Sequence, residues 1–131
     1  MKTLIVEDDF TSRLLLQEVL KKYGPCHIAV NGKEAIAASY AALEKGEPYD
    51  LICLDVMMPE MDGQEALRRI RAEEESRGIW STEGAKIVMI TALGNRNNVS
   101  TAYQNLCDGY LVKPVKKAEL LEVLRKLTLV E

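Results

Sequence analysis

The sequence has little of what several common protein classes require. It contains one histidine and three cysteines in 131 residues, and no two cysteines stand in C-x-x-C spacing. This argues against a disulfide framework and against a zinc site. Seventeen Lys and Arg face 20 Asp and Glu, for a net charge of −3. The chain therefore lacks the basic surface that neutralises nucleic-acid phosphates, and we expect no nucleic-acid partner.

Long hydrophobic runs are also absent. No segment approaches the roughly 18–20 apolar residues that span a membrane. The apolar residues 4–6 near the start are followed by three acidic residues, too early for a signal peptide. Each of the three cysteines, Cys26, Cys53 and Cys107, lies in an apolar run, which predicts buried free thiols. Free thiols in turn favour a reducing compartment for the protein. We expect a soluble cytoplasmic domain with no membrane partner.

Short apolar runs alternate with longer segments of helical periodicity. The runs predict strands at residues 4–6, 27–30, 51–54, 87–90 and 110–112. Helices are expected at about residues 15–23, 32–45, 65–75, 99–106 and 120–127. This alternation predicts an α/β fold whose parallel sheet carries helices on both faces. Residues 1–131 are expected to form one domain with no output domain.

One connection is longer than the alternation requires. Residues 76–85 precede the fourth strand and contain Trp80, the only tryptophan. We expect Trp80 and Ile79 to pack against the third helix as a small apolar cluster. A functional loop is the alternative, since long loops in compact domains often carry function.

Polar residues follow four of the five expected strands. The acidic residues 7–9 follow the first strand, Asp55 the third, Thr91 the fourth and Lys113 the fifth. Parallel sheets bind ligands at these strand ends. Carboxylates gathered there repel one another unless a hard cation such as Mg²⁺ joins them. Together these residues predict an aspartate nucleophile that attacks phosphorus, while the Thr91 hydroxyl and the Lys113 ammonium contact the phosphoryl oxygens. The alternative for Asp9 alone is that it caps the first helix.

Four motifs together resemble the receiver domain of two-component response regulators over essentially the whole chain. They are Val-Glu-Asp-Asp at 6–9, Asp-Val-Met-Met-Pro-Glu-Met-Asp-Gly at 55–63, Ile-Thr-Ala at 90–92 and Tyr-Leu-Val-Lys-Pro at 110–114. The resemblance implies a flavodoxin-like, doubly wound five-stranded parallel sheet in the order 2-1-3-4-5, with five helices. It also implies a signalling domain rather than an enzyme.

The resemblance assigns a role to each acidic position. Asp55 would accept a phosphoryl group from a phosphohistidine on a sensor histidine kinase or a histidine phosphotransfer protein. Asp9 and Asp55 would bind Mg²⁺ directly, Asp8 through a water, and Met57 through its backbone carbonyl. The domain would catalyse its own phosphorylation and dephosphorylation at Asp55.

The resemblance also assigns the conformational output. Thr91 and Lys113 would contact the phosphoryl oxygens, and the bond between Lys113 and Pro114 would be cis. Movement of Thr91 would let Tyr110 turn inward. The surface that changes would comprise about residues 97–127, from the fourth to the fifth helix, and would dock on a downstream protein target.

Three departures from the family pattern affect these expectations, and the long connection at residues 76–85 is the first. Leu106 and Cys107 stand where the family often has Gly followed by a small residue. Met57 and Leu93, which flank the site, are apolar and cannot orient an attacking water. We expect the phosphoryl group to be lost about tenfold or more slowly than in a variant with Asn at 57 and Glu at 93.

Two rival functions share parts of the pattern. An FMN-binding flavodoxin needs a phosphate-binding loop after the first strand, where this chain has the acidic residues 7–9. A phosphohydrolase of the haloacid dehalogenase type needs an acidic residue two positions after its nucleophile, where Met57 stands. Within the receiver interpretation, a stand-alone switch and a phosphorelay intermediate are both open. A monomer is expected, with a dimer through the face of the fourth and fifth helices as the alternative.

Overall fold

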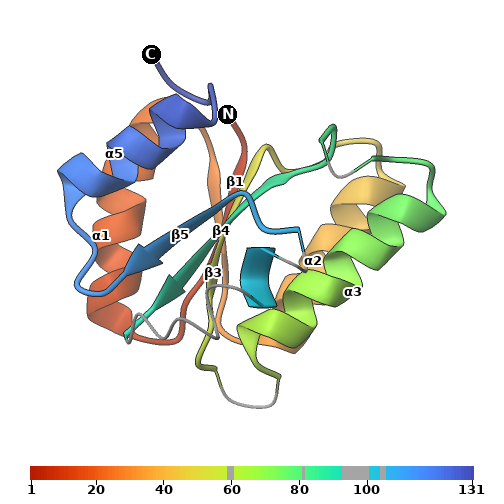
Figure 1. Ribbon diagram of the computed structural model, residues 1–131, viewed down its shortest axis with the longest axis horizontal. Coiled ribbons are helices and arrows are strands. Elements are labelled where there is room, and N and C mark those ends of the chain that lie inside the picture. The colour runs from red at the N-terminus through yellow and green to blue at the C-terminus, as the bar shows by residue number, and fades with distance from the viewer. Residues whose placement is uncertain (59–60, 81, 93–100, 104–105) are drawn as a thin grey trace.

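The computed structural model describes residues 1–58, 61–80, 82–92, 101–103 and 106–131. Within them, five parallel strands form one sheet in the order β2-β1-β3-β4-β5 (Figure 1). The strands are β1 (Thr3–Val6), β2 (Cys26–Ala29), β3 (Leu51–Asp55), β4 (Lys86–Thr91) and β5 (Gly109–Val112). The predicted fold class and strand order are confirmed.

Helices cover both faces of this sheet. The longer described helices are α1 (Phe10–Leu20), α2 (Gly32–Glu44), α3 (Gly63–Ser76) and α5 (Lys117–Lys126), and a short 3-10 helix, η1 (Lys21–Tyr23), follows α1. Residues 101–103 are also helical, and the rest of the predicted fourth helix lies outside the described residues. Side-chain oxygens of Asp9, Asn31 and Asp62 accept backbone N–H groups and so fix where α1, α2 and α3 begin. None of the described helices is long and apolar enough to cross a membrane.

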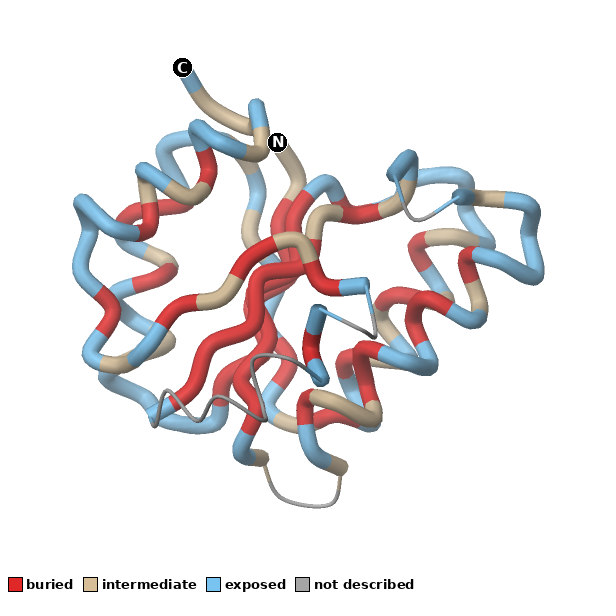
Figure 2. Tube along the Cα trace, viewed as in Figure 1, coloured by how far each residue is buried: buried red, intermediate tan, exposed pale blue. Residues whose placement is uncertain are grey.

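The core consists of two clusters, one on each face of the sheet. Leu16 and Leu20 of α1 and Leu120 and Leu124 of α5 pack on one face. Alanine and aliphatic side chains of α2 and α3 pack on the other. The central strands β1 and β3 are buried along their whole length, as Figure 2 shows, because both of their faces are covered. The thiols of Cys53 and Cys107 are buried and free, as predicted, whereas the free thiol of Cys26 is only partly buried.

The connection at residues 76–85 differs from its prediction. The Ile79 backbone N–H donates to the Glu74 carbonyl at 2.9 Å, which holds Ile79 against the end of α3. Trp80 does not pack there and is 75% exposed. Its carbonyl accepts the backbone N–H groups of Glu83 at 2.8 Å and Gly84 at 3.0 Å. These bonds place Trp80 at the start of a turn, where its ring stays in solvent.

A buried arginine ties three segments together at one side of the sheet. Arg71 of α3 is 6% exposed. Its Nε donates to the carbonyl of Leu106 at 2.9 Å, and Nη2 donates to Oδ2 of Asp108 at 2.6 Å. Its Nη1 donates to Oε1 of Glu74 at 2.7 Å and to the carbonyl of Ala85 at 2.8 Å. Arg71 thus joins α3, the residue before β4 and the turn before β5.

Leu106 in that turn has an unusual backbone conformation. Its φ is +72°, in the left-handed region that favours glycine. This is the position where the sequence resemblance places a family glycine. The leucine therefore occupies a conformation that costs an L-residue roughly 1–2 kcal/mol.

Candidate functional site

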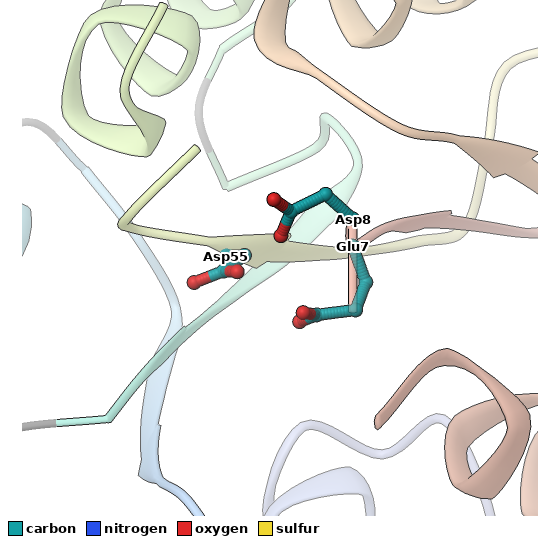
Figure 3. Close-up of side chains that lie close together, drawn as sticks. All are labelled: Glu7, Asp8 and Asp55. Carbon is teal, nitrogen blue, oxygen red and sulfur yellow. The ribbon is translucent and has the colours of Figure 1, made fainter. Parts of the chain in front are cut away.

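Three carboxylates meet at the carboxyl end of the sheet. Glu7 and Asp8 directly follow β1, and Asp55 ends β3, the neighbouring strand. Each can contribute one oxygen to a group whose members all lie within 4.8 Å of one another (Figure 3). The burial of β1 and β3 fixes the backbone on both sides of this group, so its members are held together by the fold.

Asp9 lies outside this group, although the sequence resemblance assigned it a direct bond to Mg²⁺. Its Oδ2 accepts the backbone N–H of Ser12 at 2.9 Å and caps α1. Hydrogen bonds from Ser12 lower the pKa of the Asp9 carboxyl. The structure brings Glu7 into the group instead. Glu7 is part of the motif at 6–9, but the resemblance assigned it no role. Asp9 directly precedes the helical segment, and an aspartate at this N-cap position is the signal that separates the two residues.

Glu7 is fully buried beside an ammonium group. Lys113 Nζ lies 2.8 Å from Oε1 of Glu7 and 3.3 Å from Oδ2 of Asp55. Burial, together with the charge of Asp55, raises the pKa of Glu7 to about 7, and the contact with Lys113 only partly offsets this. Burial alone would lower the pKa of Lys113, but its hydrogen bond to Glu7 and the charge of Asp55 raise it. Lys113 therefore holds two carboxylates together.

The cluster contains an oxygen that suits a bound cation. Oε2 of Glu7 is buried and has no hydrogen-bond partner among the described residues. A buried carboxylate oxygen without a donor is costly, and a divalent cation removes that cost. Three carboxylates beside one ammonium leave negative charge to neutralise. The donor set consists of oxygens, as Mg²⁺ prefers.

The loop after Asp55 shapes the mouth of the site. Oδ1 of Asp55 accepts the backbone N–H of Met57 at 3.1 Å, and the Met57 residue is 69% exposed. At the start of α3 the chain comes close to the end of β3 again, and the Gly63 N–H donates to the Val56 carbonyl at 2.8 Å. A Cβ at Gly63 would lie 2.3 Å from the carbonyl oxygen of Asp55. Only glycine permits this close return.

The remaining predicted residues come from β4 and β5. Thr91 ends β4 and is 2% exposed. The Tyr110 side chain is half-buried, and burial raises its pKa while the neighbouring Thr91 side chain opposes this effect. The peptide bond between Lys113 and Pro114 is cis, as the resemblance implied. Leu93, the other flanking position of the prediction, lies outside the described residues.

Comparison with known sequences identifies the family. A family model described as the response regulator receiver domain matches residues 3–125. The chain belongs to this family. The chemotaxis protein CheY of Listeria monocytogenes is 31% identical over 131 residues, which cover 96% of this chain and 97% of CheY. The sensor protein GacS of Pseudomonas syringae is 35% identical over 129 residues, which cover 97% of this chain but 13% of GacS. This receiver domain thus spans only a small part of GacS.

Solved receiver domains share the fold. The receiver domain of the sensor histidine kinase PA1611 from Pseudomonas aeruginosa is 27% identical, with a TM-score of 0.77, and the match covers 96% of this chain and 95% of that one. Its crystal structure has a magnesium ion coordinated in the active-site cleft. A chain of the CheX–CheY–BeF3–Mg²⁺ complex from Borrelia burgdorferi matches 100% of this chain and 90% of its own, at 25% identity and a TM-score of 0.81. Receiver domains of this family are signalling switches.

Proposed function

We propose that Asp55 is the phosphoacceptor of this receiver domain and takes its phosphoryl group from a phosphohistidine on a sensor histidine kinase or a histidine phosphotransfer protein. The observation that carries the proposal is the group of Glu7, Asp8 and Asp55 with Lys113 Nζ placed between two of its carboxylates. A carboxylate that serves as a nucleophile towards phosphorus needs neighbours that offset the charge of the phosphoryl oxygens. This cluster supplies an ammonium group and oxygen ligands for Mg²⁺.

The carboxylates divide the work in this proposal. Oxygen of Asp55 attacks phosphorus, the phosphorus–nitrogen bond breaks, and its electron pair returns to the imidazole of the donor. Asp8 and Asp55 would hold Mg²⁺, with the Met57 carbonyl as a further ligand and Glu7 beside them. The bound ion supplies positive charge against the phosphoryl oxygens. Asp8 thereby takes the direct role that the sequence resemblance gave to Asp9.

Thr91 and Lys113 stabilise the product and transmit its formation. An aspartyl phosphate adds charge and acceptor oxygens, which the Thr91 hydroxyl and the Lys113 ammonium can pair. Because Thr91 adjoins the half-buried Tyr110, a shift of Thr91 changes the space available to that ring. The surface around β5 and α5 would then present a different face to a protein target, either as a switch or as a phosphorelay intermediate.

Intact-protein mass spectrometry tests the proposal. Incubation with Mg²⁺ and acetyl phosphate should give one phosphoryl adduct that hydroxylamine removes. The adduct should be absent from Asp55→Asn and from a sample with EDTA. Asp8→Asn should lose most of the adduct, whereas the matched variant Asp9→Asn should keep it, because the Asp9 carboxylate caps α1. An adduct on Asp55→Asn, or the reverse order of the two neighbours, would contradict the assignment.

A further inference from the structure

A cavity lies at the amino end of the sheet, away from the end that carries Asp55. It has a volume of about 210 Å³. Its walls come from the end of α2, the residues before β3, the turn between α3 and β4, and Leu129 near the C-terminus. In Figure 1 this turn is the green segment that leads from α3 to β4. The volume is below the roughly 300–1,000 Å³ of small-molecule pockets, so it suits a single side chain.

The walls of this cavity combine aliphatic surface with negative charge. Leu43, Pro48 and Ile79 contribute apolar surface, and the charged lining residues are three acids and one base: Asp50, Glu74, Glu83 and Lys86. Glu74 is already paired with Arg71. A side chain with an aliphatic stem and a cationic head matches this lining, because the stem can lie on apolar atoms while the head meets carboxylates.

The only tryptophan of the chain is next in sequence to a residue that lines this cavity. Trp80 is 75% exposed and follows Ile79, which lines the cavity. The bonds from the N–H groups of Glu83 and Gly84 to the Trp80 carbonyl hold Trp80 and Glu83 in one turn. Tyrosine and tryptophan are enriched at protein interfaces, and tryptophan is the aromatic that attracts cations best. The exposed ring of Trp80 and the carboxylate of Glu83 thus belong to one turn.

We propose that Trp80, Glu83 and the adjoining cavity form a second protein-binding surface, which takes a positively charged segment of a partner protein. One arginine or lysine side chain of that segment enters the cavity with its head towards Glu83 and Asp50. A second cationic side chain lies on the Trp80 ring. This surface is separate from the carboxylate cluster, so its binding does not depend on the proposed phosphorylation of Asp55.

Peptide binding followed by fluorescence anisotropy tests this surface. The probe is a fluorescein-labelled peptide of alternating arginine and leucine, and the reference is the same peptide with glutamate in place of arginine. We expect saturable binding of the arginine peptide only. Glu83→Lys should weaken binding by about tenfold or more, since it reverses a charge at the contact. Glu122→Lys, the same charge change on an exposed residue of α5, should change it less than about twofold.

Two further readouts locate the contact. Trp80 emission should change on binding of unlabelled arginine peptide, and Trp80→Ala should weaken binding without loss of folding, because the ring is largely in solvent. Asp55→Asn should bind the peptide as the unaltered protein does, which separates this proposal from the function of Asp55. Equal weakening by Glu83→Lys and Glu122→Lys would overturn the proposal, since it would show an effect of net charge alone. An unchanged Trp80 emission or an absence of binding would also overturn it.

Discussion

Replacing Arg71 with methionine should strongly destabilise the domain. Arg71 and Glu74 form an ion pair in which both side chains are nearly inaccessible, at 5% and 3% exposure. Methionine keeps much of the side-chain length but removes the charge and every donor. Glu74 would then be a buried carboxylate without its partner, and Asp108 and the Leu106 carbonyl would each lose a donor. The three segments that Arg71 joins would lose their common partner.

The expected loss follows from that burial. Removing one partner of a buried ion pair typically costs about 3–5 kcal/mol, because the other charge stays uncompensated. This is a large share of the 5–15 kcal/mol by which native domains are usually stable. For a domain of this size it corresponds to a fall in Tm of roughly 10–18 °C. Arg71→Met should therefore leave a folded protein whose free energy of unfolding is much smaller.

The chain contains a matched control on the same helix. Arg68 pairs with Glu65, also three residues away, but these side chains are 57% and 33% exposed. Arg68→Met should cost about 0.5 kcal/mol or less, because solvent screens an exposed pair. The assay is urea unfolding followed by circular dichroism, with free energies compared at equal m-values. The double variant with Glu74→Met should recover part of the loss. Similar effects at the two arginines would refute this reasoning.

Three further predictions concern particular residues of the site and of the turn before β5. Leu106→Gly should be more stable than Leu106→Ala by about 0.5–1 kcal/mol in thermal unfolding, because only glycine relieves the φ of +72°; the usual order of alanine above glycine would contradict it. In EDTA, the free energy of unfolding should fall as pH rises from 4.5 to about 7, since Glu7 keeps a proton in the folded protein that it releases in the unfolded chain. Glu7→Gln should reduce this dependence on pH, measured by urea unfolding at several pH values. A variant with Asn at Met57 and Glu at Leu93 should lose its phosphoryl group about tenfold or more faster by mass spectrometry, because it can orient water; equal decay would contradict this.

The fold and much of the site could be predicted because hydrophobic patterns report burial. Continuous apolar runs mark strands covered on both faces, and polar residues after them mark one edge of a parallel sheet. That logic places Asp55, Thr91 and Lys113 at the ends of β3, β4 and β5 or just beyond them. It needs no knowledge of side-chain direction, since the topology alone brings these positions together.

The acidic motif shows where this logic stops. Three successive acids follow β1, and a pattern of residue types does not say which of them turns towards Asp55. The start of α1 decides this, because Asp9 satisfies the N–H of Ser12 and leaves Glu7 and Asp8 for the cluster. The exposure of Trp80 could not be predicted from residue types for a similar reason. Backbone bonds place Trp80 in a turn, and its ring is exposed despite its apolar character.

Gly63 changes how amino-acid replacements around Asp55 should be interpreted. The carbonyl of Asp55 occupies the space where a side chain at position 63 would begin. Any larger residue there must displace the backbone that carries the carboxylate, even though position 63 contributes no functional group of its own. In a mutational scan scored by signalling output, position 63 would be as intolerant as the acidic positions and could be mistaken for a chemical participant. The absence of a side chain at position 63 thus helps to fix the position of the Asp55 carboxylate.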